Sequence, residues 1–495
     1  MPDGPATGAE RGAGPERGVV FPIEGARRAT STTGRGVVAD ALRAVDPVGA
    51  RAAAGEANWR AAYPVHFRRL VEAGLDPAED ALSIARSGLA SVHERMLWCR
   101  PDGMDVPLPE ARHAPGRDLM TETVTGAGEP ERTLRLPYRG QRLEGAALLR
   151  QLDAWVAAGV IEPGCAEAVR AVAAHPDWLD LRDERVVVLG AAAEMAPLRS
   201  LLRWGAEVLA VDLPVPELWR RLIDDSARYA GRLHVAADAD RGGADLAGRV
   251  GADLVTEWPA VARWLGEQPG RLVLANAVYA DGATNVRVSV AVDLLTEQLR
   301  KHRPDTALSF LATPTDVFAV PGADVARSVA AYEHASVSRV LRGPLRTISG
   351  GRLLTRAYVP GADPGINDSI VPQQGPNYLL AKRIQRWRAT VARAEGVTVS
   401  LNVAPPTRTR SVVKNRALAA AYAGAHRFGI EVFEPATSNT LMAALLVHDL
   451  RTGVTTLGDP WRDEAARAAH GGLWTTAYAP RSALGLAALL GVGSR

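Results

Sequence analysis

Lysine is almost missing from this chain of 495 residues, since only Lys301, Lys382 and Lys414 occur and the other 55 of its 58 basic residues are arginine. Such a bias, beside abundant alanine, indicates a GC-rich coding sequence, so arginine clusters alone do not indicate binding of nucleic acid. The formal net charge is only +3, and no block of five or six like charges occurs. We therefore expect no nucleic-acid partner.

Cysteine and long apolar runs are also scarce. Cys99 and Cys165 stand too far apart for a C-x-x-C motif, and the ten histidines lack ligand spacing, so we expect no metal site and a reducing, cytoplasmic setting. The longest apolar stretches, such as 443–447 and 484–492, are too short to cross a bilayer. The first 36 residues lack the apolar core of a signal peptide, which agrees with a cytoplasmic protein without membrane contact.

The length predicts two to four domains at about 100–200 residues each. Residues 1–37 are rich in Gly, Pro and Arg without periodicity, which predicts a disordered arm. Residues 38–180 repeat apolar side chains every three or four positions, which predicts a mostly helical N-terminal domain. Within it, 121–124 and 133–136 are expected to pair as a hairpin. No chemistry is recognisable there, so we expect a cap or an oligomer interface.

Residues 181–495 alternate short apolar runs with helical patterns. The runs occur at 186–189, 208–211, 233–236, 272–274, 307–311 and 397–403. Continuous apolar strands that alternate with helices predict an α/β fold with a doubly wound parallel sheet of the Rossmann type. Roughly 317–376 is expected to be an insertion over the substrate side of the cleft.

The first strand ends at a turn that begins with Gly190, and the second ends at Asp212, 22 residues later. A strand–turn–helix unit aims backbone N–H groups at an anion, and an acidic residue at this distance meets an adenosine ribose hydroxyl. Aspartate there repels a 2′-phosphate, which favours NAD over NADP. The glycine fingerprint is reduced to Gly190, with Ala192 and Ala196 in the other positions. An S-adenosylmethionine-dependent methyltransferase would contain a very similar half.

Tyr378 and Lys382 form a Tyr-x-x-x-Lys motif at the start of a predicted helix. With nine tyrosines and three lysines in the chain, about 0.05 such pairs are expected by chance. Residues i and i+4 share a helical face, so the ammonium is expected to lower the pKa of the phenol and to make it a usable general acid or base.

A predicted strand at 396–403 follows this helix and runs into Ala404-Pro405-Pro406-Thr407-Arg408-Thr409. Here, over roughly 183–450, the chain resembles the short-chain dehydrogenase/reductase superfamily, although Pro406 stands where the family usually has glycine. The resemblance implies that Tyr378 and Lys382 are catalytic. It also implies a cofactor site at Gly190, Ala192, Glu194, Met195, Asp212, Leu213, Asp253, Asn276, Ala277, Lys382, Pro405, Thr407 and Thr409.

Two assignments stay open within the resemblance. Asp238 competes with Asp253 for the position near the adenine. The family's catalytic hydroxyl is expected from Thr313, which follows the fifth strand, with Thr315 and Ser369 as alternatives. We favour Thr313 because a side chain at a strand end points to the carboxyl edge of the sheet.

The leading hypothesis is an NAD(P)-dependent oxidoreductase that transfers hydride to or from a carbonyl or hydroxyl carbon. The alternatives are a methyltransferase, or a redox-neutral lyase, isomerase or binding protein that retains a dinucleotide. We expect a small-molecule substrate, bacterial specialised metabolism and a homo-oligomer. An anionic substrate would suit the arginines of the insertion, which are Arg327, Arg339, Arg342, Arg346, Arg352 and Arg356.

Overall fold

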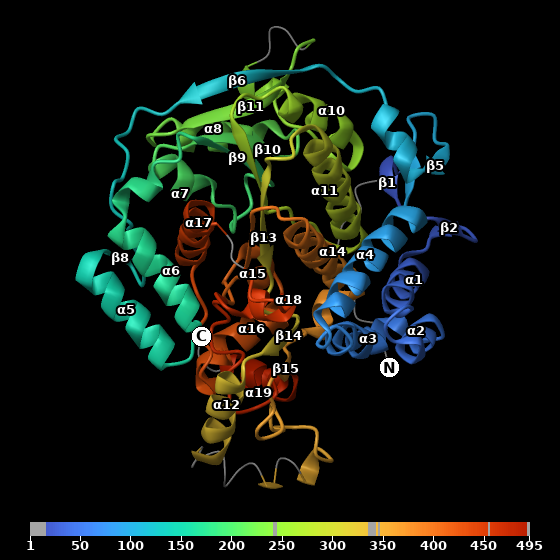
Figure 1. The fold of residues 1–495 in the computed structure, drawn as a ribbon, viewed down its shortest axis with the longest axis vertical. Coiled ribbons are helices and arrows are strands. Elements are labelled where there is room, and N and C mark those ends of the chain that lie inside the picture. The colour runs from blue at the N-terminus through green and yellow to red at the C-terminus, as the bar shows by residue number, and fades with distance from the viewer. Residues whose placement is uncertain (1–15, 241–244, 335–342, 345–346, 454–455, 493–495) are drawn as a thin grey trace.

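The computed structural model describes residues 16–240, 245–334, 343–344, 347–453 and 456–492. Its centre is a seven-stranded sheet in the order β16-β13-β12-β9-β10-β11-β6 (Figure 1). The strands are β6 (Leu119–Thr125), β9 (Glu184–Leu189), β10 (Glu207–Val211), β11 (Arg232–Asp238), β12 (Arg271–Asn276), β13 (Ala307–Ala312) and β16 (Val399–Val403).

Six strands run parallel, and β6 is antiparallel to β11. Counted in chain order from β9, the parallel strands have the order 3-2-1-4-5-6 of Rossmann-like folds. The predicted α/β class with a mostly parallel sheet is therefore confirmed. The order reverses between β9 and β12, and ligands of such sheets bind at the carboxyl ends of the strands beside this switch point.

Both faces of the sheet are buried, which explains the continuous apolar strands. Val187 and Leu189 of β9 join one hydrophobic cluster, and Val186 and Val188 join the other, because successive residues point to opposite faces. The first face is covered by α10 (Leu254–Gly266), α11 (Gly282–His302) and α14 (Gly375–Ala394). The second is covered by α7 (Leu198–Arg203), α8 (Pro216–Ser226), α9 (Leu246–Arg249) and α17 (Pro435–Thr452).

Strand β6 corrects the predicted hairpin. It pairs with β11 from Leu119↔Asp238 to Thr125↔Arg232, whereas β7 (Leu136–Tyr138) pairs with β8 (Gln141–Leu143). The edge of β11 offers a long row of backbone hydrogen-bonding groups. This long-range pairing outcompetes the local hairpin.

Residues 16–37, expected to be disordered, are instead ordered, while 1–15 lie outside the described residues. Residues 16–37 contain β1 (Gly18–Val20), β2 (Ile23–Glu24), β3 (Arg27–Arg28) and the start of α1 (Thr30–Leu42). Strand β1 pairs with β4 (Leu97–Cys99), which also pairs with β5 (Asp105–Pro107). Gly18 has φ +75°, and an added Cβ would lie 2.1 Å from the carbonyl oxygen of Val255. Arg287 donates to the carbonyl of Val19 at 2.6 Å. These contacts with α10 and α11 order the segment.

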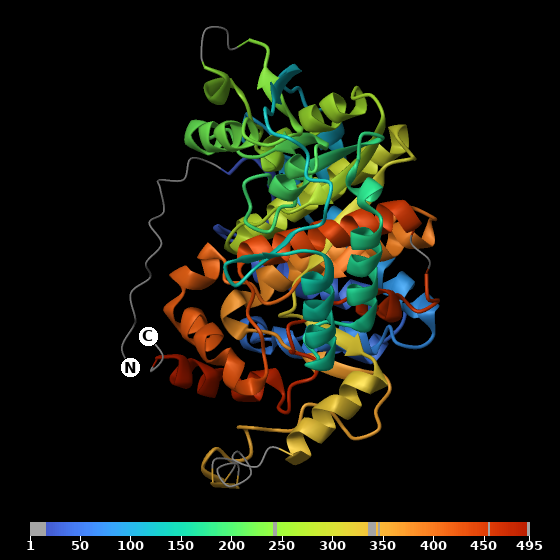
Figure 2. The same ribbon diagram turned by 90° about the vertical axis from the view of Figure 1, so that its left-hand side faces the viewer.

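The expected N-terminal helices are present, and they share the hydrophobic clusters of the sheet. Gly88 lies so close to the ring of Trp387 in α14 that an added Cβ would be 2.5 Å away. The helices on this face are α1, α2 (Pro47–Ala54), α3 (Trp59–Glu72), α4 (Ala78–Arg95) and η1 (Leu108–His113). The N-terminal helices on the other face are α5 (Gly145–Ala157), α6 (Pro163–Ala174) and η2 (Pro176–Leu179). Of these, α6 contacts α17 (Figure 2).

The insertion between β13 and α14 extends from the end of the molecule opposite β6 (Figure 1). It contains an antiparallel pair, β14 (Val317–Val320) with β15 (Gly365–Asp368), together with α12 (Gly322–His334) and η3 (Pro372–Gln374). The remaining elements are α15 (Arg410–Lys414), α16 (Arg416–Gly424), η4 (Ala425–Phe428), α18 (Pro460–Ala465) and α19 (Pro480–Val492). Among the helices that the structure describes, none combines the length and apolarity needed to span a membrane.

Candidate functional site

The turn after β9 approaches the segment after β12 closely. Gly190 has φ +76°, and an added Cβ would lie 3.0 Å from the backbone of Ala277 and Val278. Glycine is therefore required there. The alanines that follow in the turn have no positive φ, so the backbone does not need the missing glycines of the fingerprint.

Asp212 lies at the carboxyl end of β10 and is half-buried. Its carboxylate accepts the N–H groups of Ala192 and Leu213, both at 2.8 Å. Burial raises the pKa of Asp212, and these two hydrogen bonds oppose the rise. Each carboxylate oxygen keeps acceptor capacity for a further donor, such as a ribose hydroxyl.

The rest of the turn is held by its own backbone and by the C-terminal part of the chain. The N–H of Ala193 binds the carbonyl of Gly190, and the N–H of Ala196 binds that of Ala193, both at 3.0 Å. The Glu194 carboxylate accepts the N–H of Arg410 at 2.7 Å. Several N–H groups predicted to face a pyrophosphate are thus engaged within the protein.

A cavity of about 10 Å³ lies at the switch point. Such a volume holds about one water molecule. Its lining includes the predicted residues Met195, Asn276 and Ala277. Asn276 accepts the N–H of Val278 at 3.1 Å, and the N–H of Ala277 binds the carbonyl of Leu189 at 2.9 Å. Three of the predicted cofactor residues thus line this cavity, which is too small for a nicotinamide.

The Tyr378 side chain interacts with that of Thr313, which follows the carboxyl end of β13. The Thr313 hydroxyl lies 2.9 Å from the Thr315 hydroxyl. Interactions with both hydroxyls and with Gln374 lower the pKa of Tyr378, but burial outweighs them and raises it above its ordinary value. Ser369, the third candidate, instead donates to the side chain of Asn367.

Lys382 follows one turn later on α14. Its ammonium donates to the carbonyl of Leu311 at 3.5 Å and to Gln385 at 3.4 Å. Burial lowers the pKa of Lys382 to about 8, although nearby Asp316 favours the charged form. The prediction of a lowered phenol pKa is wrong in this structure, because burial decides the direction for Tyr378 and the negative charge of Asp316 adds to the rise.

Two further tyrosines accompany Tyr378, and the sequence pattern did not reveal either. The ring of Tyr279, in the segment after β12, meets that of Tyr378 edge-on at 6.3 Å between centroids. Tyr279 donates its hydroxyl to Asp281 at 2.8 Å. Tyr422 of α16 is half-buried, and desolvation together with its interaction with Tyr378 raises the pKa of Tyr422.

The other predicted residues have local partners. Asp253 accepts the N–H of Val255 at 2.9 Å and so caps α10, and its neighbour Ala252 donates its N–H to the carbonyl of Asp212. Its competitor Asp238 pairs with Arg117 at 3.0 Å. The remaining hydroxyls bond close by: Thr407 to the carbonyl of Pro405 at 2.8 Å, and Thr409 to Ser411 at 2.9 Å.

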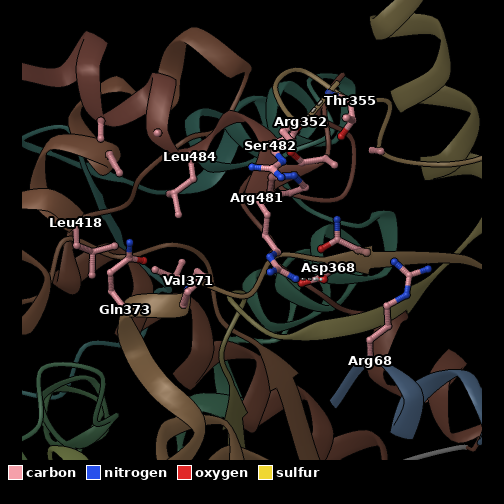
Figure 3. Close-up of a pocket in the computed structure, with 18 of the residues that line it drawn as sticks. Arg68, Arg352, Thr355, Asp368, Val371, Gln373, Leu418, Arg481, Ser482 and Leu484 are labelled. Carbon is pink, nitrogen blue, oxygen red and sulfur yellow. Dashed lines mark hydrogen bonds and ion pairs between the residues drawn. The ribbon is translucent and has the colours of Figure 1, made fainter. Parts of the chain in front are cut away.

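A cavity of about 610 Å³, to which α3, the insertion, α16 and α19 contribute, was not predicted (Figure 3). Arg68 of α3, Arg352 of the insertion and Arg481 of α19 line it. Among the arginines expected to bind an anion, Arg352 thus lines a cavity, and Arg327 donates to the carbonyl of Val156 at 2.7 Å. Arg356 lies over the ring of Tyr332, and Arg339, Arg342 and Arg346 fall outside the described residues.

Among the residues that the structure describes, two groups of acidic residues and histidine have metal-like spacing, and both have protein partners. In the first, Arg388 donates to Asp293 at 2.6 and 2.8 Å and to Glu297 at 2.9 Å. In the second, Nδ1 of His470 accepts the N–H of Gly472, so the ring proton lies on Nε2 and points to Glu162 at 3.0 Å. A metal ligand normally has the reverse arrangement, with its other ring nitrogen donating.

Comparison of the chain with protein-family models, curated proteins and solved structures finds no significant match.

Proposed function

We propose that the chain is an NAD(P)-dependent oxidoreductase in which Tyr378 is the general acid for reduction of a carbonyl group. The observation that carries this proposal is the convergence of the Tyr378 phenol with the hydroxyls of Thr313 and Thr315. They meet at the carboxyl end of β13, the edge where doubly wound sheets bind their ligands. Three hydroxyl groups there suit a substrate oxygen that changes its charge during reaction.

The raised pKa of Tyr378 defines its role, because the phenol carries its proton at neutral pH. Thr313 donates a hydrogen bond to the carbonyl oxygen, and Tyr378 transfers its proton to the same oxygen as negative charge develops there. The nicotinamide, when bound, supplies the hydride that adds to the carbonyl carbon. The ammonium of Lys382, one turn along α14, would donate hydrogen bonds to the ribose of the nicotinamide.

The residues at the switch point suit a dinucleotide at its adenosine end. Asp212 presents a carboxylate with spare acceptor capacity, and an aspartate there favours NAD over NADP. At the other end, the cavity of about 10 Å³ must widen to admit a nicotinamide. Its walls include Met195 and Met442, and methionine side chains adapt readily.

Parallel calorimetry with NADH, NADPH and S-adenosylmethionine tests the proposal. We expect micromolar binding of NADH, at least tenfold weaker binding in Asp212→Ala, and unchanged binding in Tyr378→Phe. In a screen of carbonyl compounds, Tyr378→Phe should lose about 10²–10⁴-fold in turnover. Tyr279→Phe is the matched control, because it removes a neighbouring hydroxyl that bonds to Asp281.

Two results would contradict the proposal. Binding of S-adenosylmethionine without either nicotinamide nucleotide would indicate a methyltransferase and leave Tyr378 and Lys382 without a catalytic role. A dinucleotide that binds but is neither oxidised nor reduced with any substrate would indicate the redox-neutral alternative.

A further inference from the structure

The cavity of about 610 Å³ has the size of a site for a small organic molecule. Its walls come from α3, β15, α16, α19 and the segment before β15. Figure 3 shows the guanidinium groups of Arg352, Arg481 and Arg68 on one side, and Val371, Leu418 and Leu484 on the other. The cavity therefore has a cationic end and an apolar end.

The positive charge at the cationic end is not fully neutralised by carboxylates of the protein. Asp368, the one carboxylate among the lining residues, is paired with Arg481 at 2.8 Å. Arg68 bonds to Glu72 at 2.7 Å through Nε, in an exposed pair of the kind that contributes little. Within the described part of the chain, the guanidinium of Arg352 has no hydrogen-bond or ion-pair partner. With Arg481 paired to Asp368 and Arg68 bonded to Glu72, the positive charge of Arg352 is left for a ligand.

The apolar end leads toward the proposed reaction centre. A second cavity, of about 70 Å³, shares Val371, Ala421, Pro480, Arg481 and Leu484 with the first. Beyond these shared residues it is lined by Tyr422 and by Thr315, whose hydroxyl contacts Thr313. Its lining is almost wholly apolar apart from Thr315, Ser369, Thr476 and Arg481. The two cavities together extend from the arginines to the hydroxyl group that interacts with Tyr378.

We propose that the larger cavity binds the carboxylate of an amphipathic organic acid, with its apolar body directed through the smaller cavity. A planar carboxylate matches the paired N–H donors of a guanidinium group, and the apolar walls favour a hydrocarbon body. Resting on the proposed function, this assigns the substrate class as an oxo acid whose carbonyl group, distant from its carboxylate, reaches Thr315 and Tyr378. Binding of the acid itself requires no nucleotide.

Calorimetry on the full chain without nucleotide tests the site, with decanoate below its micelle concentration as the probe. We expect decanoate to bind, and acetate and 1-decanol to bind at least tenfold more weakly, because each lacks one half of the recognition. Arg352→Gln should weaken decanoate binding at least tenfold, and Arg352→Lys should bind with intermediate affinity. Leu484→Asn should weaken the binding of decanoate without affecting folding, which circular dichroism would verify.

Arg416→Gln is the matched control, since Arg416 is exposed at the start of α16 and does not line either cavity. Equal decanoate affinity in wild type and Arg352→Gln, or 1-decanol binding as tightly as decanoate, would overturn the assignment. So would the absence of decanoate binding in a protein that reduces simple carbonyl compounds with NADH, which leaves the proposed function intact. If decanoate binding depends on Arg352 in a protein that binds no nicotinamide nucleotide, the carboxylate site is supported. The proposed oxidoreductase function is then contradicted.

Discussion

Gly190 shows why one glycine suffices in the first β–α turn. Its φ of +76° and its approach to Ala277 require the absence of a side chain, whereas the alanines after it keep negative φ. The dinucleotide-binding fingerprint therefore contains more glycines than the backbone conformation of this turn requires. The sequence located this turn correctly, but only the structure distinguishes the essential glycine from positions where alanine suffices.

Replacing Gly190 by alanine is expected to destabilise the protein by about 1–3 kcal/mol, because the added Cβ meets backbone atoms of the neighbouring segment at 3.0 Å in a strained conformation. Chemical denaturation measures the loss. Gly266→Ala is the control: it lies at the end of α10 with nothing within 4 Å of an added Cβ, so we expect no loss or a gain of up to about 1 kcal/mol. Similar losses in both variants would contradict this reasoning.

Tyr378 shows the limit of a motif at the residue scale. The four-residue spacing correctly predicted that Tyr378 and Lys382 share α14, and the end of a predicted strand located Thr313. The direction of the phenol pKa depends on burial, which comes from tertiary packing, and on the charge of nearby Asp316. No local pattern contains that information.

At the scale of elements, α14 is held to α11 by buried charge. Arg388 of α14 donates to both oxygens of Asp293 in α11, and His93 of α4 contacts the same carboxylate at 2.8 Å. The pKa of Asp293 is strongly lowered because its interactions with Arg388 and His93 outweigh its burial. Three helices, one of them from the N-terminal region, therefore meet at a single carboxylate.

Asp293→Asn should destabilise the protein by about 3–5 kcal/mol, since it leaves the buried guanidinium of Arg388 with Glu297 alone. Glu395→Gln is the matched control. It removes a more exposed pair between Arg300 of α11 and Glu395, which follows α14, at 2.8 Å, and should cost no more than about 1 kcal/mol. Urea denaturation of both variants measures the loss in free energy of unfolding for each pair. Equal losses would show that burial does not determine how much the Asp293–Arg388 pair stabilises the protein.

At the scale of the whole molecule, a buried group joins three distant parts of the chain. Glu162 precedes α6, Asp324 lies in α12 and His470 follows α18, with their ligating atoms within 4.8 Å of one another. Burial raises the pKa of both Glu162 and Asp324 to about 7 and lowers the pKa of His470 to about 4, while Arg327 favours the ionised carboxylates. The native cluster is thus closest to neutral at mildly acidic pH.

Stability should consequently fall as the pH rises from about 4.5 to 7. Over this range the native carboxyl groups bind protons that the unfolded chain has released, so their contribution is fully present below the unfolded pKa values and is lost through about 7. His470 opposes them with one proton between about 4 and 6.5. Because two carboxyl groups act against one imidazole, the net effect of the cluster is a loss of stability as the pH rises.

Glu162→Gln resembles the protonated carboxyl group and should reduce this pH dependence. We expect wild type and variant to have similar melting temperatures at pH 5, and the variant to be more stable by about 1–3 kcal/mol at pH 7.5. Thermal denaturation at both pH values provides the measurement. Glu395→Gln, an exposed carboxylate, should keep the wild-type pH profile, and a Glu162→Gln profile parallel to wild type would refute the role of the cluster.

The sequence by itself determined the local features: the six parallel strands, Asp212 at one strand end, and Tyr378 and Lys382 on one helix. These follow from apolar periodicity and from side-chain spacing along a helix, which act over a few residues. Only the tertiary structure decided that β6 joins the sheet and that residues 16–37 are ordered. It also brought Arg68, Arg352 and Arg481 to one cavity. Such contacts join segments that are far apart in the chain, and their energy comes from burial and pairing that no local pattern encodes.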